Sequence, residues 1–121
     1  DKKSIILQAD FNFNHSTYDE IFKKNNHIKL KREETQPIKE KTSGSTFKNP
    51  PDKFAAELIE KAGCKGLQVG DASISNVHAN FIINNGSATA TDIEKLGTKV
   101  IKRVKDEFGI ILEWEIKILG E

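Results

Sequence analysis

The stretch with the most obvious chemical potential runs from Thr42 to Pro50 and reads TSGSTFKNP. A glycine between small hydroxyl residues lets backbone N–H groups approach an anion, and Lys48 could complete a site for a phosphate or a carboxylate. The run is not a complete phosphate loop, because the second glycine and the hydroxyl residue after the lysine are missing. The same composition is typical of an ordinary serine-rich turn, so the residues alone leave both interpretations open.

The other reactive side chains are scattered along the chain. His15, His27 and His78 have no partners at metal-ligand spacing, so the sequence predicts no metal site, and a structural hydrogen-bonding role is expected for His78. Cys64 follows a helix-ending glycine, where a buried, unreactive thiol is the commoner outcome. Glu115 lies in a Glu-x-Glu-x-Lys alternation that is usually a solvated sheet surface. Glu115 would have a functional role only if the run from Thr42 to Pro50 folds over this face of the strand.

Composition narrows the class of protein. The chain has 121 residues, 36% of them hydrophobic, which predicts one soluble domain with a modest core. Its 19 basic and 18 acidic residues nearly cancel, so nucleic acid is a poor first choice of partner, and an RNA-binding domain using the lysines ranks last. One cysteine favours a reducing, cytoplasmic location. No stretch approaches a membrane span, and the start at Asp1, without an initiator methionine, suggests a fragment.

Periodicity predicts the elements that must position these side chains. Apolar residues alternate from Ile5 to Phe13, as in a half-buried strand, and a cap at 16–19 begins a helix that reaches about Lys31. Residues 32–48 fit neither period and are expected to form a long loop, which is usually functional or disordered. The remaining predictions are a helix over 51–63, strands over 67–75 and 79–84 with a bulge or bend at Gly70, a helix over 89–109 and a strand over 110–119. The order β-α-loop-α-β-β-α-β predicts an α+β domain with helices packed on a small mixed sheet.

Four blocks, in order, resemble the family of UDP-N-acetylenolpyruvoylglucosamine reductases. The first is GSTFKNP, which resembles the family's G-S-x-F-K-N-P signature. The others are VGDA with Ser75 and HANFI, similar to I-G-G-A … S-x-x-H-A-x-F-I; NGSATA, similar to N-x-x-A-T-A; and FGIILEWEI, similar to F-G-V-x-L-E-P-E-V. Together they cover nearly the whole chain, and their compatible spacing makes coincidence improbable.

The resemblance implies a flavoenzyme of peptidoglycan precursor synthesis, in which NADPH reduces FAD and the flavin reduces the enolpyruvyl group of a UDP-sugar to give UDP-N-acetylmuramate. The family's proton-donating serine falls on Ser45. Its catalytic glutamate, which stabilises or protonates the enolate-like intermediate, falls on Glu115, and a substrate-contacting asparagine falls on Asn49. Lys48 is a plausible partner for a substrate anion, and Gly44 suits close backbone approach to the substrate.

The resemblance also implies what lies elsewhere. No dinucleotide fingerprint occurs, so residues 1–121 are expected to be a single C-terminal substrate-binding domain without cofactor-binding residues, inactive alone, whose partner is an upstream FAD-binding domain. The chain departs from the family's pattern at Asp71, Trp114 and Lys117, of which the last loses a bidentate arginine grip. The alternative is a non-catalytic module that binds a nucleotide sugar or another anion through residues 44–49.

Overall fold

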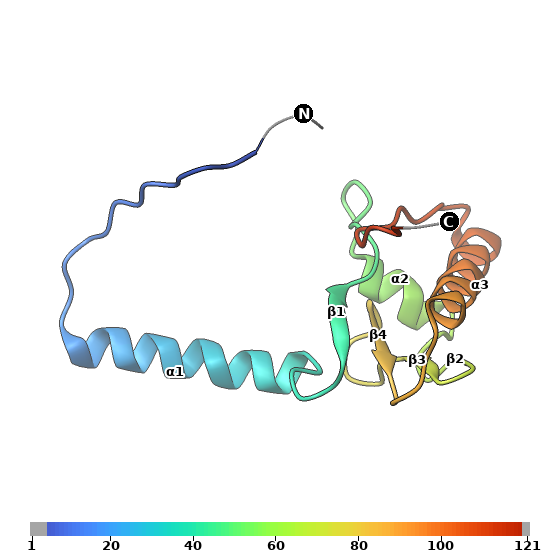
Figure 1. Cartoon of the computed structure of the whole chain (residues 1–121), viewed down its shortest axis with the longest axis horizontal. Coiled ribbons are helices and arrows are strands. Elements are labelled where there is room, and N and C mark those ends of the chain that lie inside the picture. Colours follow the sequence, from blue (N-terminus) through green and yellow to red (C-terminus); the bar gives the residue numbers. More distant parts are fainter. Residues whose placement is uncertain (1–4, 120–121) are drawn as a thin grey trace.

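The computed structural model describes residues 5–119 and confirms the α+β class. The elements in the described range are α1 (Tyr18–Thr35), β1 (Thr42–Ser45), α2 (Ala55–Lys61), β2 (Gln68–Val69), β3 (Ala72–Ile74), β4 (Phe81–Asn84) and α3 (Ala90–Phe108). Figure 1 shows that β1 to α3 gather into one compact part, while α1 and the residues before it extend away from that part.

The sheet is antiparallel throughout the described residues, so the prediction of a mixed sheet was wrong. Its strand order is β1-β4-β3-β2, and each neighbouring pair runs antiparallel. The predicted strand over 67–75 is instead a hairpin of β2 and β3, which reverses at Gly70, where φ is +53°. Parallel strands need a long crossover, and the short connections from β2 to β4 leave no room for one.

Helix α3 supplies much of the core. Leu96, Val100 and Val104 recur every fourth residue, and all three are fully buried. They join Ile59 of α2 and Ile74 of β3 in one hydrophobic cluster. The predicted ends of this helix are confirmed, because Thr89 forms a capping box with Asp92 and Gly109 adopts a left-handed φ of +69°.

The predicted N-terminal strand over 5–13 is not formed. These residues belong to no helix or strand, and their apolar side chains are exposed. A strand is stable only beside a partner, and none of the described residues pairs with this segment. The sequence alternates as expected, but the described chain offers residues 5–13 no neighbouring strand with which to pair.

Helix α1 is confirmed and is longer than predicted. Thr17 caps it through a capping box with Glu20, and the helix continues to Thr35. It buries none of its residues. The apolar stripe expected on one face, which consists of Ile21, Phe22, Ile28 and Leu30, is exposed along its length.

Two further predictions were wrong in detail. The expected loop over 32–48 contains the last turn of α1 and all of β1, because β1 is a short polar edge strand formed only by pairing with distant β4. The expected strand over 110–119 reduces to one bridge, between Phe47 and Trp114. Its alternation still buries Leu112, but its bridge partner Phe47 lies outside the strands, so no ladder forms.

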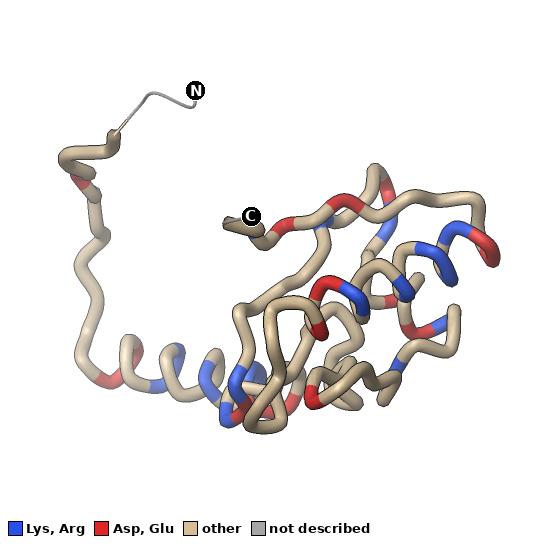
Figure 2. Tube along the Cα trace, turned by 45° about the vertical axis from the view of Figure 1, so that its right-hand side comes forward, with Lys and Arg blue, Asp and Glu red and all other residues tan. Residues whose placement is uncertain are grey.

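Charge is spread over the chain without a dominant sign. Figure 2 shows Lys and Arg interspersed with Asp and Glu along both the compact part and α1. Exposed pairs such as Lys61 with Glu57 and Lys102 with Asp106 join neighbouring turns of the same helix. No helix in the described part of the chain is long and apolar enough to cross a membrane.

Candidate functional site

A cavity of about 360 Å³ opens where the end of β1 meets the C-terminal segment. Its lining includes Ser45, Asn49, Phe54, His78, Asn80 and Glu115. Three of the five predicted site residues, which are Ser45, Asn49 and Glu115, therefore share one cavity although up to 70 positions separate them in sequence. Its volume lies at the small end of the range for ligand pockets, so it can enclose only part of a nucleotide sugar.

Two backbone hydrogen bonds bring Glu115 to the serine. The Lys48 N–H donates to the Glu113 carbonyl and the Glu115 N–H donates to the Thr46 carbonyl, both at 2.9 Å. They flank the bridge between Phe47 and Trp114. Glu115 is thereby placed opposite Thr46, one residue from Ser45.

Asn80 clamps the chain immediately after Ser45. Its buried side chain accepts from the Phe47 N–H at 2.9 Å and donates to the Phe47 carbonyl at 2.8 Å. Its backbone carbonyl accepts from the Thr46 N–H at 2.8 Å. Because both backbone groups of Phe47 are held by one side chain, the segment that carries Ser45 has little freedom to shift.

Trp114 anchors the other side of the site. Its ring lies 5.0 Å, between centroids, from that of Phe47. It also reaches α3 at Gly97, where a Cβ atom would lie only 1.9 Å from the indole. Gly97 therefore provides the space in which Trp114 packs, and this packing holds the segment that bears Glu115.

The serine itself is accessible. Ser45 is exposed at the end of β1, and its hydroxyl makes no hydrogen bond with another described residue, so it is free to face a ligand. Gly44 precedes it with φ of +90°, a conformation that favours glycine. No atom lies within 4 Å of a Cβ built at Gly44, so this backbone angle, rather than crowding, requires the glycine.

Asn49 lines the cavity, whereas Lys48 does not. The Asn49 Oδ1 accepts from the Ala55 N–H at 2.9 Å, at the start of α2, which orients the side chain and leaves its Nδ2 donors for the cavity. Lys48 lies outside the cavity and pairs with Glu113 at 3.3 Å, beside a smaller hollow of about 190 Å³. Both side chains of this pair are exposed, so the pairing holds Lys48 only weakly.

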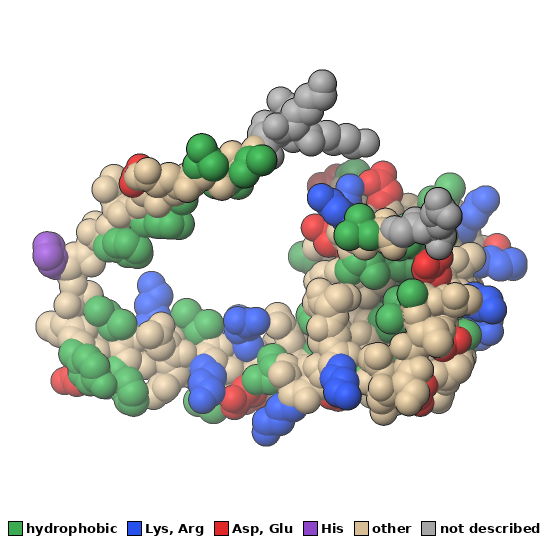
Figure 3. Space-filling view, viewed as in Figure 1, with side chains coloured by type: hydrophobic (Ala, Val, Ile, Leu, Met, Phe, Trp, Pro, Cys, Tyr) green, Lys and Arg blue, Asp and Glu red, His purple; other side chains and the backbone are tan. Residues whose placement is uncertain are grey.

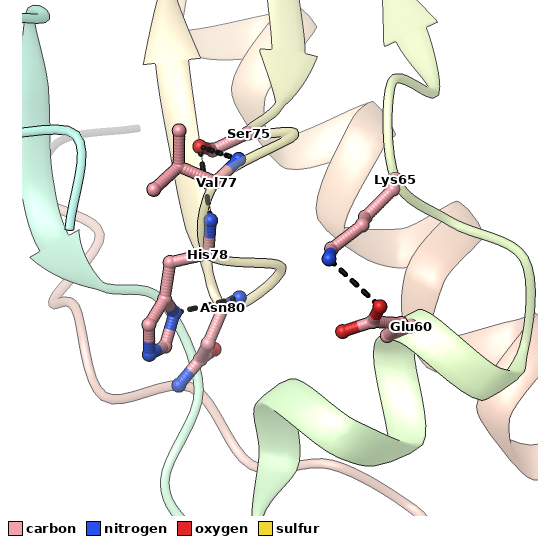
Figure 4. A network of polar contacts seen from close by, with 6 residues as sticks. All are labelled: Glu60, Lys65, Ser75, Val77, His78 and Asn80. Carbon is pink, nitrogen blue, oxygen red and sulfur yellow. Dashed lines mark hydrogen bonds and ion pairs between the residues drawn. The ribbon is translucent and has the colours of Figure 1, made fainter. Parts of the chain in front are cut away.

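His78 is a cavity residue whose lining role the sequence did not predict. Figure 4 shows the turn that presents it: the Ser75 Oγ accepts from the Val77 and His78 N–H groups at 3.1 and 3.3 Å, and the His78 Nδ1 accepts from the Asn80 N–H at 3.3 Å. Burial, with a smaller effect of Lys65, holds the pKa of His78 below its usual range. The hydrogen-bonded role expected for it is confirmed. A neutral ring that accepts at Nδ1 carries its proton on Nε2 and can donate from there.

The described residues hold no group of three or more His, Cys, Asp or Glu side chains arranged for a metal ion. Cys64 is fully buried, and burial raises the pKa of its thiol. The expectation that this cysteine is buried is therefore confirmed.

Comparisons with known proteins agree on one family. A model described as "UDP-N-acetylenolpyruvoylglucosamine reductase, C-terminal domain" matches residues 36–119. The chain is 51% identical over 120 residues to the UDP-N-acetylenolpyruvoylglucosamine reductase of Rhodopseudomonas palustris strain BisB5, which covers 99% of this chain and 39% of that protein. The Rickettsia conorii reductase is 50% identical over 119 residues, or 98% of this chain and 40% of that protein.

A solved structure agrees with these sequences. The UDP-N-acetylenolpyruvylglucosamine reductase (MurB) from Thermus caldophilus superposes with a TM-score of 0.68 and 42% identity, over 84% of this chain and 36% of that one. The chain thus spans about two fifths of the length of the curated relatives that it matches.

Proposed function

The chain belongs to the UDP-N-acetylenolpyruvoylglucosamine reductase family, as its C-terminal domain, and on that premise we propose that it is the substrate-binding part of an FAD- and NADPH-dependent oxidoreductase. The reaction reduces the enolpyruvyl C=C bond of UDP-N-acetylglucosamine enolpyruvate and yields UDP-N-acetylmuramate, in the cytoplasm, for peptidoglycan synthesis. The observation that supports it best is the single cavity lined by Ser45, Asn49 and Glu115.

In this proposal Ser45 is the proton donor. When bound in the complete enzyme, the flavin supplies a hydride to the vinyl carbon distal to the substrate's carboxylate. The electron pair of the C=C bond then forms an enolate-like centre at the neighbouring carbon, and the Ser45 hydroxyl proton moves to that carbon. A serine hydroxyl is a poor acid in water, so it requires a strongly basic acceptor and fixed placement.

The neighbouring residues provide that placement. The Asn80 clamp on Phe47 fixes the backbone beside Ser45, and Glu115, on the opposite segment, stabilises or protonates the enolate-like intermediate. Asn49 donates from Nδ2 to the substrate. Lys48, which lies outside the cavity, is the partner of a substrate anion, and Gly44 allows the backbone beside Ser45 to approach the substrate closely. Phe54 helps to exclude water from the cavity, which strengthens each polar contact inside it.

In this proposal FAD and NADPH are not bound by this chain. No dinucleotide fingerprint occurs in its sequence, and a cavity of about 360 Å³ is too small for FAD together with a nucleotide sugar. We therefore expect FAD and NADPH to be held by an upstream FAD-binding domain, and residues 1–121 to be inactive alone. The partners of this chain are then that domain and the UDP-sugar.

The test is Ser45→Ala in the complete enzyme. We expect NADPH to bleach the flavin at the normal rate, while substrate reduction in a single turnover slows by about 100-fold or more because the proton donor is lost. Ser43→Ala is the matched control, since Ser43 is an exposed serine of the same strand outside the cavity.

Full turnover by Ser45→Ala would remove this residue from the mechanism. Binding of the UDP-sugar by the unmodified complete protein, with neither flavin reduction nor turnover, would favour a non-catalytic nucleotide-sugar module instead.

A further inference from the structure

Residues 110–119 carry Glu115, yet this C-terminal segment has few fixed points. Within the described chain it forms no helix, and its one strand-like contact is the bridge at Trp114. In the same range, two backbone hydrogen bonds hold it, one at the Glu113 carbonyl and one at the Glu115 N–H, both at 2.9 Å. Among the described residues, no backbone hydrogen bond involves a residue after Glu115. The placement of the Glu115 carboxylate must therefore depend on the packing of nearby side chains.

Trp114 is the packed side chain nearest to Glu115. In the segment, the side chains that lie on the hydrophobic cluster are those of Ile110, Leu112 and Trp114. Trp114 is the last of these along the chain and directly precedes Glu115. Figure 3 shows open space between residues 5–35 and the compact part, so in this view they add no support to the segment.

The indole of Trp114 lies directly against α3. A Cβ atom built at Gly97 would overlap three carbons of its six-membered ring, which are Cη2, Cζ2 and Cζ3. Gly97 is buried in the face of α3 that packs on the core, and the helix is capped at both ends. We call this contact the Gly97 socket. Because only a glycine leaves room for the ring there, the two residues fit each other as a pair.

Trp114 also packs on Phe47, whose own position is fixed separately. The planes of the two rings are inclined by 36°. Phe47 is fully buried, and the Asn80 side chain holds both of its backbone groups. In Figure 1 the C-terminal segment returns from the end of α3 to the chain that follows β1, which is where these contacts occur. Trp114 is thus held between a capped helix and a clamped aromatic residue.

Ser45 and Glu115 are therefore positioned by different means. Ser45 lies two residues before Phe47, on a chain that Asn80 fixes without help from Trp114. The Glu115 N–H bond to the Thr46 carbonyl fixes the backbone alone. The distance between the two cavity residues then depends on the packing of the residue before Glu115.

We propose that Trp114 is a positioning residue for Glu115: the indole, held in the Gly97 socket and against Phe47, sets the place of the Glu115 carboxylate in the cavity. In the family's pattern a proline stands at this position, and a proline ring would fix the backbone angle φ. This chain uses the packing of a side chain for the same purpose. The inference rests on the proposed function in taking Glu115 to act on the enolate-like intermediate.

The first experiment is a double-mutant cycle in the complete enzyme. Trp114→Leu should slow substrate reduction in a single turnover by about 10-fold or more, because a small misplacement of a reacting group slows the reaction strongly. Flavin reduction by NADPH and the affinity for the UDP-sugar should stay within about 2-fold of the unmodified enzyme. In a Glu115→Gln background, Trp114→Leu should slow the reaction by less than about 2-fold, since the group that it positions is already absent.

Equal slowing in both backgrounds, or none in either, would overturn the proposal, because a merely structural role does not depend on Glu115. Ile118→Ala is the control in the same segment, since Ile118 is 52% exposed and lies outside the cavity lining. It should change neither flavin reduction nor substrate reduction.

A second set of variants separates positioning from a folding defect of Trp114→Leu. Trp114→Pro restores the residue of the family's pattern but empties the Gly97 socket, so it should slow substrate reduction. Adding Gly97→Leu fills the socket and should bring the rate to within about 3-fold of the unmodified enzyme. Adding Thr98→Leu instead should recover none of the rate, because Thr98 is the exposed neighbour of Gly97 on α3. Equal rates in the two double variants would contradict the role of the socket.

Hydrogen exchange, followed by mass spectrometry in the complete enzyme, gives a readout that does not depend on catalysis. The amide of Glu115 should exchange at least ~10-fold faster in Trp114→Leu, while amides of β3 and β4 exchange as before. Faster exchange together with full turnover by Glu115→Gln would refute the chemical role of Glu115 and leave the positioning intact. Unchanged exchange in Trp114→Leu would overturn the positioning, whatever the turnover of Glu115→Gln.

Discussion

At the scale of single residues, the candidate site depends on side chains that satisfy backbone groups. Asn80 occupies both the N–H and the carbonyl of Phe47, which is what a neighbouring strand would otherwise do. In the turn that presents His78, the Ser75 Oγ accepts from two backbone N–H groups, those of Val77 and His78. Each buried amide or hydroxyl that holds a backbone group contributes about 1 kcal/mol, and leaving its partner unsatisfied costs more.

His78 gives this arrangement a dependence on pH. Its pKa is lowered in the folded protein, so the folded state binds fewer protons than the unfolded state near pH 6. The stability that this supplies is present above the unfolded pKa of about 6.5 and is lost as the pH falls through the folded value. Protonation at Nδ1 also removes the acceptor for the Asn80 N–H.

The prediction is that the free energy of unfolding of the chain decreases between about pH 7.5 and pH 5, and that His78→Gln flattens this decrease. The control is His27→Gln, which alters an exposed histidine of α1 and should leave the slope unchanged. Urea titrations at several pH values measure it. An unchanged slope in His78→Gln would show that the ring does not titrate with folding.

Single residues also show what the sequence could and could not predict. The blocks that suggested Ser45, Asn49 and Glu115 were sufficient to identify three residues that share a cavity. They gave no role for Asp71, at which the chain departs from the family's pattern. Gly70 takes the left-handed conformation at this turn, and the Asp71 carboxylate accepts from the Ser87 N–H at 2.7 Å. Such contacts between distant turns leave no periodic signal.

At the scale of elements, the site is assembled by packing of α3 on the C-terminal segment. The bridge between Phe47 and Trp114 uses the N–H groups of Lys48 and Glu115 and not that of Trp114. A proline at 114, as in the family's pattern, would therefore lose no hydrogen bond of this pairing. What tryptophan adds is an indole that occupies the space above Gly97.

Gly97→Ala should consequently destabilise the protein. A helix gains about 1 kcal/mol when alanine replaces glycine, but a Cβ atom 1.9 Å from the indole forces Trp114 out of its position. Overpacking of this kind costs about 1–3 kcal/mol, so we expect a net loss in urea unfolding. A double-mutant cycle with Trp114→Leu tests the cause, because the second substitution should abolish the penalty. A stabilised Gly97→Ala protein would mean that the indole moves at no cost.

Elements with strong local signals were predicted well, and those formed by distant pairing were not. Helix α3 was correct at both ends because Thr89, Gly109 and a regular apolar stripe define it locally. Strand β1 was missed because TSGS has no apolar alternation and forms by pairing with β4, about 40 residues away. The segment 110–119 shows the converse, in that its alternation is regular but it meets only Phe47, which lies outside the strands, in a single bridge.

At the scale of the whole molecule, the described chain consists of a compact part, residues 36–119, and an N-terminal arm, residues 5–35, which ends with α1. The hydrophobic cluster contains residues of the compact part alone within the described range. The arm buries no side chain in α1, and its first residues are exposed. Folding of the compact part should therefore not depend on the arm.

A protein that comprises residues 36–121 should fold with an unchanged free energy of unfolding, to within about 0.5 kcal/mol, because no core side chain is removed. Calorimetry or urea unfolding measures this. The contrasting variant ends at residue 110, and it should be strongly destabilised because it loses Leu112 and Trp114. A large loss of stability on removal of the arm would show that α1 packs on the compact part in solution.

The connection between α1 and β1 is short, so Ser45 must stay close to the end of α1 and to any domain on which α1 packs. Ten residues separate Thr35 from Ser45, and ten residues span at most about 35 Å when fully stretched. In the enzyme proposed above, the encounter between the cavity and the flavin of the upstream domain would be intramolecular within that tether, with an effective concentration in about the millimolar range. A single proteolytic cut in 36–41 would leave the compact part folded but would turn that encounter into a bimolecular one, which dilution alone could then abolish.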